Sequence, residues 1–144
     1  MKPIKNLNIV IGVCVRDGCY LLLQRKDENP MWDKKWEFPG GKIEEGEESH
    51  EAICREINEE TGLDVQTAEF FHHHIHDWDL EDKILRVHID CFHCLVGEGD
   101  VITEEGKAYQ TRWVTREEAL EMDSLKANND ILNVFFHEVL QNLG

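Results

Sequence analysis

Apolar residues occur at two different spacings along this chain, one typical of strands and one typical of helices. Short runs of aliphatic and β-branched residues predict five strands, at 7–15, 20–23, 65–75, 84–96 and around 112–114. The first two runs are separated by Asp17-Gly18, a pair that is typical of a tight β-hairpin. An acidic turn over 76–83 joins the next two.

The clearest helix pattern covers 49–61. Ala52, Ile53 and Ile57 recur there at helical spacing. Ser49 suits the N-cap, and Gly62 lies where a left-handed residue commonly ends a helix.

Two further helices are expected near the end of the chain. Thr115 and Glu118 form a capping box for a short helix through Met122. Asn129 opens an amphipathic helix whose apolar side consists of Ile131, Leu132, Phe135, Val139 and Leu140. Because helices and strands mix without a regular βαβ alternation, we predict an α+β fold, an α/β/α sandwich around a mixed sheet.

Length and charge narrow the functional classes. A chain of 144 residues is expected to form a single domain, 1–144. Its 15 basic and 30 acidic residues give a net charge of −15, which argues against binding to polymeric nucleic acid or an anionic membrane. The apolar run 9–15 is too short to span a membrane, and an odd number of cysteines without an export signal favours reduced thiols in the cytoplasm. Nothing in the sequence indicates an oligomeric state.

Two clusters of potential metal ligands lie in predicted strands. Cys91 and Cys94 should point to opposite faces of one strand, which argues against a joint metal or redox site. His72, His74 and His76 should share one face. They fit a transition-metal site, an exposed strand face or the lining of a substrate pocket.

Three carboxylates in the 49–61 helix carry the strongest chemical signal. Glu56, Glu59 and Glu60 stand at i, i+3 and i+4, so they share one helix face and repel one another. A divalent cation would remove this repulsion, and carboxylate oxygens suit Mg²⁺ or Mn²⁺. The alternative is an ordinary solvated face. Against it, Ala52 and Ile53 adjoin the carboxylates on the buried side, and a glycine-rich loop precedes the helix.

These carboxylates belong to a longer pattern that resembles a known family. It runs from the glycine-rich loop to the helix end, with fixed residues Gly41, Glu47, Arg55, Glu56, Ile57, Glu59, Glu60, Gly62 and Leu63. Every fixed position matches the Nudix box, the signature of the Nudix hydrolases. The resemblance implies an α/β/α sandwich with a mixed, curved sheet. It also implies an enzyme that cleaves a phosphoric anhydride in a nucleotide.

The resemblance also implies roles for single residues. Glu56, Glu59 and Glu60 match the metal-binding carboxylates of the family, and the carbonyl of Gly40 is a further expected ligand. Arg55 matches the arginine that orients a catalytic carboxylate, with Glu47 as its ion-pair partner. Helix geometry should point Arg55 away from Glu56 and toward Glu59.

A general base outside the box is common in this family, on a loop before a late strand. The matching loop holds Glu104 and Glu105. We favour Glu105 as the base or as an additional metal ligand, with Glu104 next and an ordinary acidic loop as the alternative.

The segment 36–42 is similar to the MutT subfamily of nucleoside triphosphate pyrophosphohydrolases. This resemblance implies a Mg²⁺-dependent enzyme, with Mn²⁺ as a substitute, that releases a monophosphate and pyrophosphate; oxidised purine nucleotides are among its expected substrates. The expected substrate-binding residues are Arg25, Phe38, Gly41, Lys42 and Asn128. For Asn128, reading of a base edge and helix capping are both open. Phe38 or Trp32 could stack on a base or pack in the core.

Two alternatives remain open. The substrate can be another nucleoside diphosphate derivative, such as CTP, dCTP, ADP-ribose or a dinucleotide. The chain can also be a catalytically silent Nudix-fold module that binds a ligand. Because Arg55 and all three helix carboxylates are intact, the sequence favours an enzyme.

Overall fold

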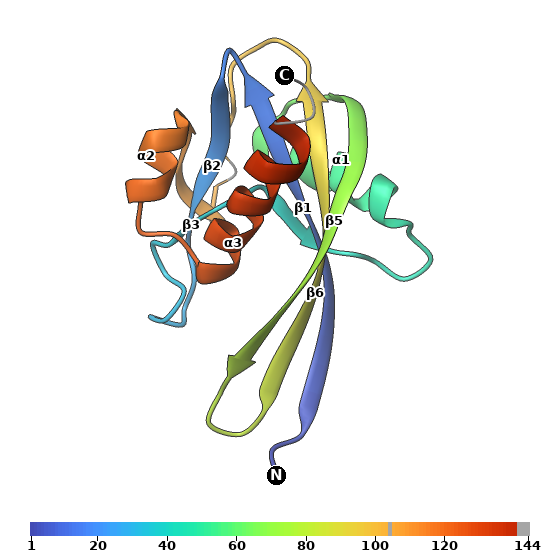
Figure 1. Ribbon diagram of the computed structural model, residues 1–144, viewed down its shortest axis with the longest axis vertical. Helices are drawn as coiled ribbons and strands as arrows, with labels where there is room; N and C mark the ends of the chain where they lie inside the picture. The colour runs from blue at the N-terminus through green and yellow to red at the C-terminus, as the bar shows by residue number, and fades with distance from the viewer. Residues whose placement is uncertain (104, 141–144) are drawn as a thin grey trace.

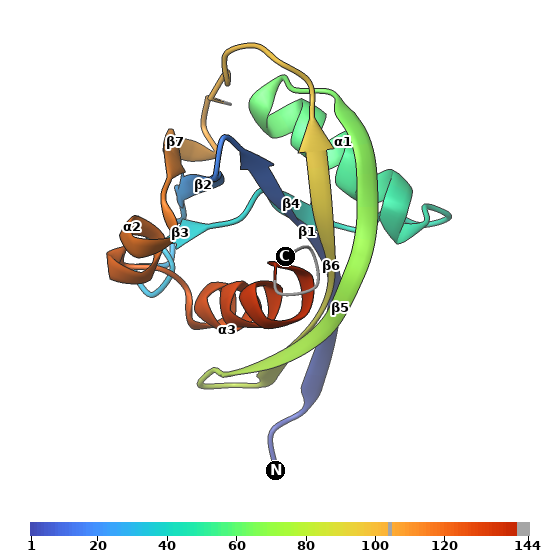
Figure 2. The same cartoon turned by 45° about the horizontal axis from the view of Figure 1, so that its top comes forward.

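Strand β1 (Ile4–Arg16) separates two hydrophobic cores in a computed structural model that describes residues 1–103 and 105–140. Ile11 and Val13 belong to one core, whereas Val10 and Cys14 belong to the other. Successive side chains of a strand point to opposite faces, so this alternation buries both faces of the sheet. Helix α1 covers one face and α3 the other, and the strands curve around α3 (Figure 2). The predicted α+β sandwich with a mixed, curved sheet is confirmed.

The sheet is built from strands of very different length. They are β1, β2 (Cys19–Arg25), β3 (Trp36–Glu37), β4 (Gly40–Lys42), β5 (Val65–Asp79), β6 (Ile84–Val96) and β7 (Ala108–Val114). The order is β3-β2-β1-β6-β5, with β4 paired to β1 and β7 to β2. Strands β1 and β6 are parallel, and the other pairs are antiparallel. The hairpin at Asp17-Gly18 is confirmed, with φ of 50° and 75° at its two central residues.

The helices are α1 (Ser49–Thr61), α2 (Arg116–Glu121) and α3 (Lys126–Phe135), and α3 continues into the π-helical turn η1 (Phe136–Leu140). Gly62 ends α1 in the left-handed conformation, at φ 77°, as expected. The N-cap of α1 is Glu48 and not Ser49, because the Glu48 N–H donates to the Glu51 carboxylate at 3.2 Å. In the part of the chain that the structure describes, the helices are too short or too polar to cross a membrane.

Helix α3 begins earlier than the sequence predicts. Its N-cap is Leu125, and its first residue is Lys126, three residues before the expected start at Asn129. A tertiary contact sets this start, since the Leu125 N–H donates to the carbonyl of Trp36 at 3.2 Å. The expected apolar side of the helix is nevertheless correct, and it packs against the sheet.

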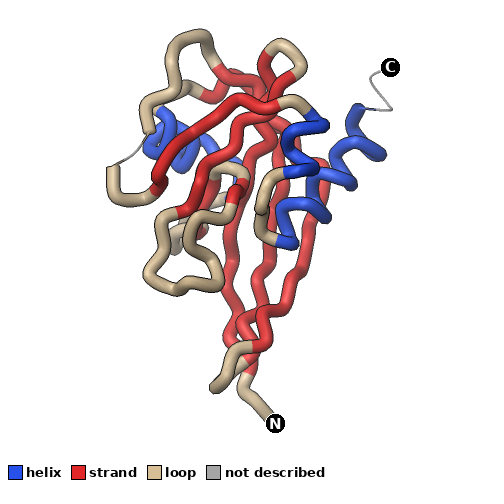
Figure 3. Tube along the Cα trace, turned by 90° about the vertical axis from the view of Figure 1, so that its left-hand side faces the viewer, coloured by secondary structure: helices blue, strands red, loops and turns tan. Residues whose placement is uncertain are grey.

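Strand β5 is longer than expected. It continues past residue 75 to Asp79, which pairs with Ile84 on β6, so only residues 80–83 remain as the turn. The polar ends of β1, β5 and β6 extend beyond the rest of the molecule (Figures 1 and 3). There Arg86 donates to both carboxylate oxygens of Asp77, at 2.9 and 3.0 Å. The polar composition of this segment hid its strand conformation.

Cys91 and Cys94, three residues apart on β6, lie on opposite faces of the sheet. Cys91 lies in the core under α3 and Cys94 in the core under α1. The prediction that they face opposite ways is therefore confirmed. All five cysteines are unpaired.

Candidate active site

Close packing of α1 on the sheet positions the carboxylates of the helix. Ala52, Ile53 and Ile57 are fully buried against β1. A Cβ added to Gly12 would lie 2.8 Å from Cδ1 of Ile57, so any larger residue here would force the Ile57 side chain to move. The carboxylate face of α1 thus borders the core, as the sequence predicts.

Glu56 and Glu60 are almost fully buried beside strand β4, with 7% and 8% of their surface exposed. A Cβ on Gly41 would approach the Glu56 carboxylate to 2.5 Å, and the Gly40 N–H donates to Glu60 at 3.3 Å. Burial, together with the hydrogen bond and charge of Glu56, raises the pKa of Glu60 to about 9. Without a cation, the pair therefore keeps a proton at neutral pH.

This donor set fits a hard divalent cation. It consists of carboxylate oxygens next to a strand whose glycines leave room for close approach. A cation between Glu56 and Glu60 would remove the repulsion that burial intensifies. Glu59 lies at the rim, with 46% of its side chain exposed.

Arg55 connects the glycine-rich loop to the carboxylates. Its guanidinium donates to both oxygens of Glu47, at 2.8 and 3.0 Å, and to Glu59 at 3.3 Å. It also donates to Glu56 at 3.0 Å. The expectation that Arg55 points away from Glu56 is therefore wrong. The long side chain folds back between loop and helix, because Glu47 and the Lys42 carbonyl hold it there.

The Arg55–Glu47 pair makes a prediction about acid stability. The Arg55 guanidinium lowers the pKa of Glu47 to about 2. Because the folded-state value lies below that of the unfolded chain, the stabilisation is present above about pH 4.5 and is lost as the pH falls toward 2. Urea unfolding at pH 6 and pH 3 should therefore show a larger loss of stability in the wild type than in Glu47→Gln. Equal losses would contradict the assigned pair.

Two cavities meet next to these carboxylates. A polar cavity of about 350 Å³ is bordered by Glu56, Glu60, Lys26 and Lys107. An apolar cavity of about 320 Å³ on the α3 side has aromatic walls, among them Trp32, Phe38 and Trp78. Both cavities are lined by Arg25, Glu37, Gly40, Gly41 and Lys42. Together they form one cleft with a charged part and an apolar part.

Comparison with known proteins shows to which family this chain belongs. The model of the NUDIX domain matches residues 6–135. The chain belongs to the Nudix family. It is 30% identical over 131 residues to the CTP pyrophosphohydrolase of Escherichia coli K12, covering 91% of this chain and 92% of that protein. It is also 36% identical over 67 residues to the 8-oxo-dGTP diphosphatase of the same organism, and this match covers 46% of this chain and 52% of that protein.

A solved structure agrees over the whole length. The MutT protein from Methanosarcina mazei Go1 superposes with a TM-score of 0.76 at 26% identity, covering 99% of this chain and 98% of that one. The prediction of a MutT-like Nudix hydrolase is therefore confirmed, including its enzyme class.

The Nudix structure places most of the predicted substrate residues at the cleft. Arg25 lines both cavities and pairs with Asp27 at 2.7 Å. Lys42 lines both as well. Phe38 is 3% exposed, so it packs in the core and also forms part of the apolar wall. Core packing, one of the two uses expected for Phe38, is therefore confirmed, and stacking on a base stays a prediction.

Asn128 lines neither of the two cavities, although its neighbour Ala127 and its hydrogen-bond partner Phe38 line the apolar one, and it does not cap α3. It is 5% exposed and occupies the first turn of the helix, after the N-cap. Its Oδ1 accepts the Phe38 N–H at 2.8 Å. Its Nδ2 is buried without a hydrogen-bond partner in the described structure. The capping interpretation is therefore wrong, and the unpaired buried donor belongs to the residue that follows Ala127, which lines the apolar cavity.

Glu37 is a residue of this Nudix site that sequence reasoning did not single out. It lines both cavities, and Arg25 donates to it at 3.3 Å. Burial raises the pKa of its carboxyl group, and the charge of Arg25 opposes that shift. A signal was present, since Glu37 is a lone carboxylate between the aromatic residues Trp36 and Phe38.

The predicted base lies on the loop next to the polar cavity. Gly106 and Lys107 border that cavity, whereas Glu105 is exposed in the same turn. Its role stays a prediction. Glu104 lies outside the described residues.

The clustered histidines predicted to share a strand face, His72, His74 and His76, lie on β5. His76 lines the apolar cavity of the Nudix domain, which favours the pocket interpretation for that residue. Burial lowers the pKa of His74 and of His76, so both imidazoles are mostly neutral at pH 7. His73, on the other face, contacts Asp90 at 2.6 Å.

Proposed function

We propose that this protein hydrolyses a nucleoside triphosphate to a nucleoside monophosphate and pyrophosphate. The observation that carries the proposal is the joined cleft, in which buried Glu56 and Glu60 border the polar cavity and aromatic side chains wall the apolar one. A triphosphate has the matching division into a charged part and a flat, weakly polar base. Arg25 and Lys42 line both cavities, so their cations suit phosphates that cross from one to the other.

Mg²⁺, with Mn²⁺ as a substitute, is the proposed cofactor. Glu56, Glu59, Glu60 and the carbonyl of Gly40 would hold it. When bound, such a cation activates an attacking water and offsets phosphate charge. Arg55 holds Glu56 and Glu59 in place through hydrogen bonds of 3.0 and 3.3 Å. Glu105 is proposed as the base or as a further ligand.

The apolar cavity is the proposed base site. Phe38, Trp32 and Trp78 provide its aromatic surface. Two buried donors near it, Nε1 of Trp32 and Nδ2 of Asn128, have no partner within the described residues. Unpaired buried donors are costly, so they favour a ligand edge that accepts hydrogen bonds. Oxidised purines and cytosine both offer such an edge. The relative named for CTP matches 91% of this chain, which makes cytosine a specific second candidate.

Product analysis tests the reaction. The protein would be incubated with Mg²⁺ and a panel of canonical and oxidised nucleoside triphosphates, ADP-ribose and a dinucleotide. Pyrophosphate together with a monophosphate is the expected result. Release of phosphate alone would show that the enzyme cleaves a different anhydride bond of the triphosphate. If no nucleotide is hydrolysed, the result would favour a catalytically silent module that binds a ligand.

Replacement of Asn128 should change the preference among bases. In Asn128→Asp the acceptor for the Phe38 N–H is kept but the free donor is lost, and in Asn128→Ala both are lost. We expect the ratio of kcat/KM between CTP and an oxidised purine triphosphate to change about tenfold in both variants. Asn133→Asp, at an exposed position of the same helix, is the matched control. An unaltered ratio in the Asn128 variants would remove this residue from base recognition.

A cytoplasmic location is also proposed. The five unpaired cysteines suit a reducing compartment. The net charge of −15 supports a small-molecule substrate and disfavours polymeric nucleic acid.

A further inference from the structure

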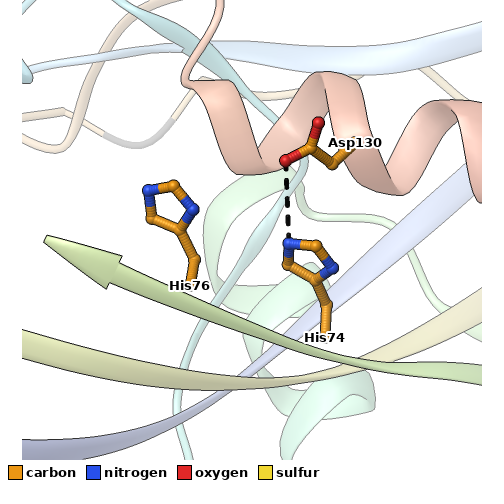
Figure 4. A group of neighbouring side chains, drawn as sticks. All are labelled: His74, His76 and Asp130. Atoms are coloured by element: carbon orange, nitrogen blue, oxygen red, sulfur yellow. Dashed lines mark ion pairs between the residues drawn. The ribbon is translucent and has the colours of Figure 1, made fainter.

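A second group of potential metal ligands lies on the α3 face of the sheet, opposite the α1 carboxylates. It consists of His74 and His76 on β5 and Asp130 on α3 (Figure 4). One ligand atom from each residue lies within 4.8 Å of the others. Nε2 of His74 is 3.9 Å from Oδ2 of Asp130.

The fold brings these residues together from distant parts of the chain. His74 and His76 are two positions apart on β5, so they share a face. Their partners on β6 are Ile89 and Val87, which belong to the core under α3. Helix α3 is held against β5 by an edge-on contact between Phe135 and Phe71, whose ring centroids are 5.5 Å apart.

The donor set differs in kind from that of α1. Two imidazoles and one carboxylate are ligands for transition metals such as Zn²⁺, whereas the α1 set offers only oxygen. Tetrahedral zinc requires ligand atoms about 3.3 Å apart. The three side chains are partly buried, with 18% of the His74 side chain and 35% of the Asp130 side chain exposed. The proposed site therefore requires these side chains to rotate so that their ligand atoms come closer together, and their partial exposure leaves them room to do so.

Lys126 would compete with a bound cation for the Asp130 carboxylate, but its ion pair with Asp130 is weak. Lys126 donates to Oδ2 of Asp130 at 3.0 Å, but 73% of the Lys126 side chain is exposed. Solvent screens an ion pair of this kind, four residues apart on a helix, so it holds Asp130 only weakly.

We propose that His74, His76 and Asp130 form a binding site for a transition-metal cation of the zinc class, with solvent as the remaining ligand. The cation would clamp α3 to β5. This site is separate from the proposed Mg²⁺ site. Binding of a cation here does not depend on the proposed function, whereas an effect of that cation on turnover rests on it.

The clamp would act on the apolar cavity. His76 lines that cavity and packs edge-on against Trp78, with ring centroids 4.7 Å apart. Ala127, which also lines that cavity, precedes Asp130 by three residues on α3. A bound cation would fix both walls of the cavity, so its effect on turnover should fall on KM more than on kcat.

Equilibrium dialysis with Zn²⁺ in excess Mg²⁺ tests the site. The wild type should bind one equivalent more than His74→Gln or Asp130→Asn, or bind that equivalent at least about tenfold more tightly. His73→Gln, a change on the opposite face of the same strand, should bind like the wild type. Co²⁺ in place of Zn²⁺ should give a visible spectrum typical of nitrogen ligation, which is lost in His74→Gln.

Two results would overturn the proposal. One is equal Zn²⁺ binding by the wild type, His74→Gln and Asp130→Asn. The other is loss of binding in His73→Gln as well, which would assign the effect to the strand as a whole. Circular dichroism of each variant checks the fold. Nucleotide turnover with Mg²⁺ alone is scored separately, so failure here leaves the proposed function untouched.

Discussion

Glu60→Gln is expected to lower kcat by at least about 10³-fold, which corresponds to ~4 kcal/mol of transition-state stabilisation. Glu60 is buried beside Glu56 and Gly40, and the proposed Mg²⁺ site depends on its negative charge. The amide of glutamine keeps the shape and an acceptor for the Gly40 N–H but loses that charge. Steady-state turnover of the preferred triphosphate, at saturating Mg²⁺, measures the effect.

The same variant should be no less stable than the wild type when metal is absent. The folded-state pKa of Glu60 is about 9, above that of an unfolded glutamate. Its contribution to stability is therefore fully present below about pH 4.5 and is lost as the pH rises toward 9. In chelator, urea unfolding at pH 6 and pH 9 should show a smaller loss of stability in Glu60→Gln than in the wild type.

Glu51→Gln provides the matched control. It makes the same chemical change on the same helix, and glutamine can still accept the Glu48 N–H that caps it. Its turnover should equal that of the wild type. Near-normal activity of Glu60→Gln would show that the α1 carboxylates do not hold the catalytic metal.

Arg55→Lys should lower kcat by about 10- to 100-fold, although the positive charge is kept. The guanidinium contacts Glu47 through two nitrogens while also reaching Glu56 and Glu59. A lysine ammonium is a single point of charge and cannot replace that geometry. The Mg²⁺ concentration for half-maximal activity should rise as the carboxylates lose their alignment. NMR titration should show the pKa of Glu47 rising from about 2 toward its ordinary value.

Arg86→Lys is the control for Arg55→Lys. Arg86 also forms a bidentate ion pair, in this case with Asp77, but the pair lies on the projecting ends of β5 and β6, and neither residue lines the cleft. Its replacement should leave turnover unchanged. A Mg²⁺ requirement and a Glu47 pKa that stay constant in Arg55→Lys would show that Arg55 does not position these carboxylates.

Local patterns in the sequence predicted the parts of the site that lie within one element. The i, i+3, i+4 spacing placed Glu56, Glu59 and Glu60 on one side of a helix, and that side does border the core. Helix spacing gave a wrong prediction for Arg55, which was expected to point away from Glu56 but donates to it. The long side chain also bonds the Lys42 carbonyl on the preceding loop, and the spacing of residues along a helix says nothing about such a contact.

Contacts between elements escaped prediction for a related reason. The Trp36 carbonyl sets the start of α3 almost ninety residues later, a span over which sequence spacing carries no information about distance. Strand β5 continues through polar residues because pairing with β6 supplies backbone hydrogen bonds that composition does not reveal. That continuation is what turns His76 toward the apolar cavity.

The sequence by itself determined the family, the helix that bears the carboxylates and the alternation of apolar residues that buries both faces of the sheet. The family followed from the resemblance of residues 41–63 to the Nudix box, and the other two features follow from the fixed repeat of helices and strands, which is a local property of the chain. Only the tertiary structure decided that the polar and apolar cavities meet, that Asn128 keeps a free buried donor and that His74, His76 and Asp130 converge. Each of these depends on strand register and on how closely helices pack against the curved sheet, and neither is encoded in local spacing.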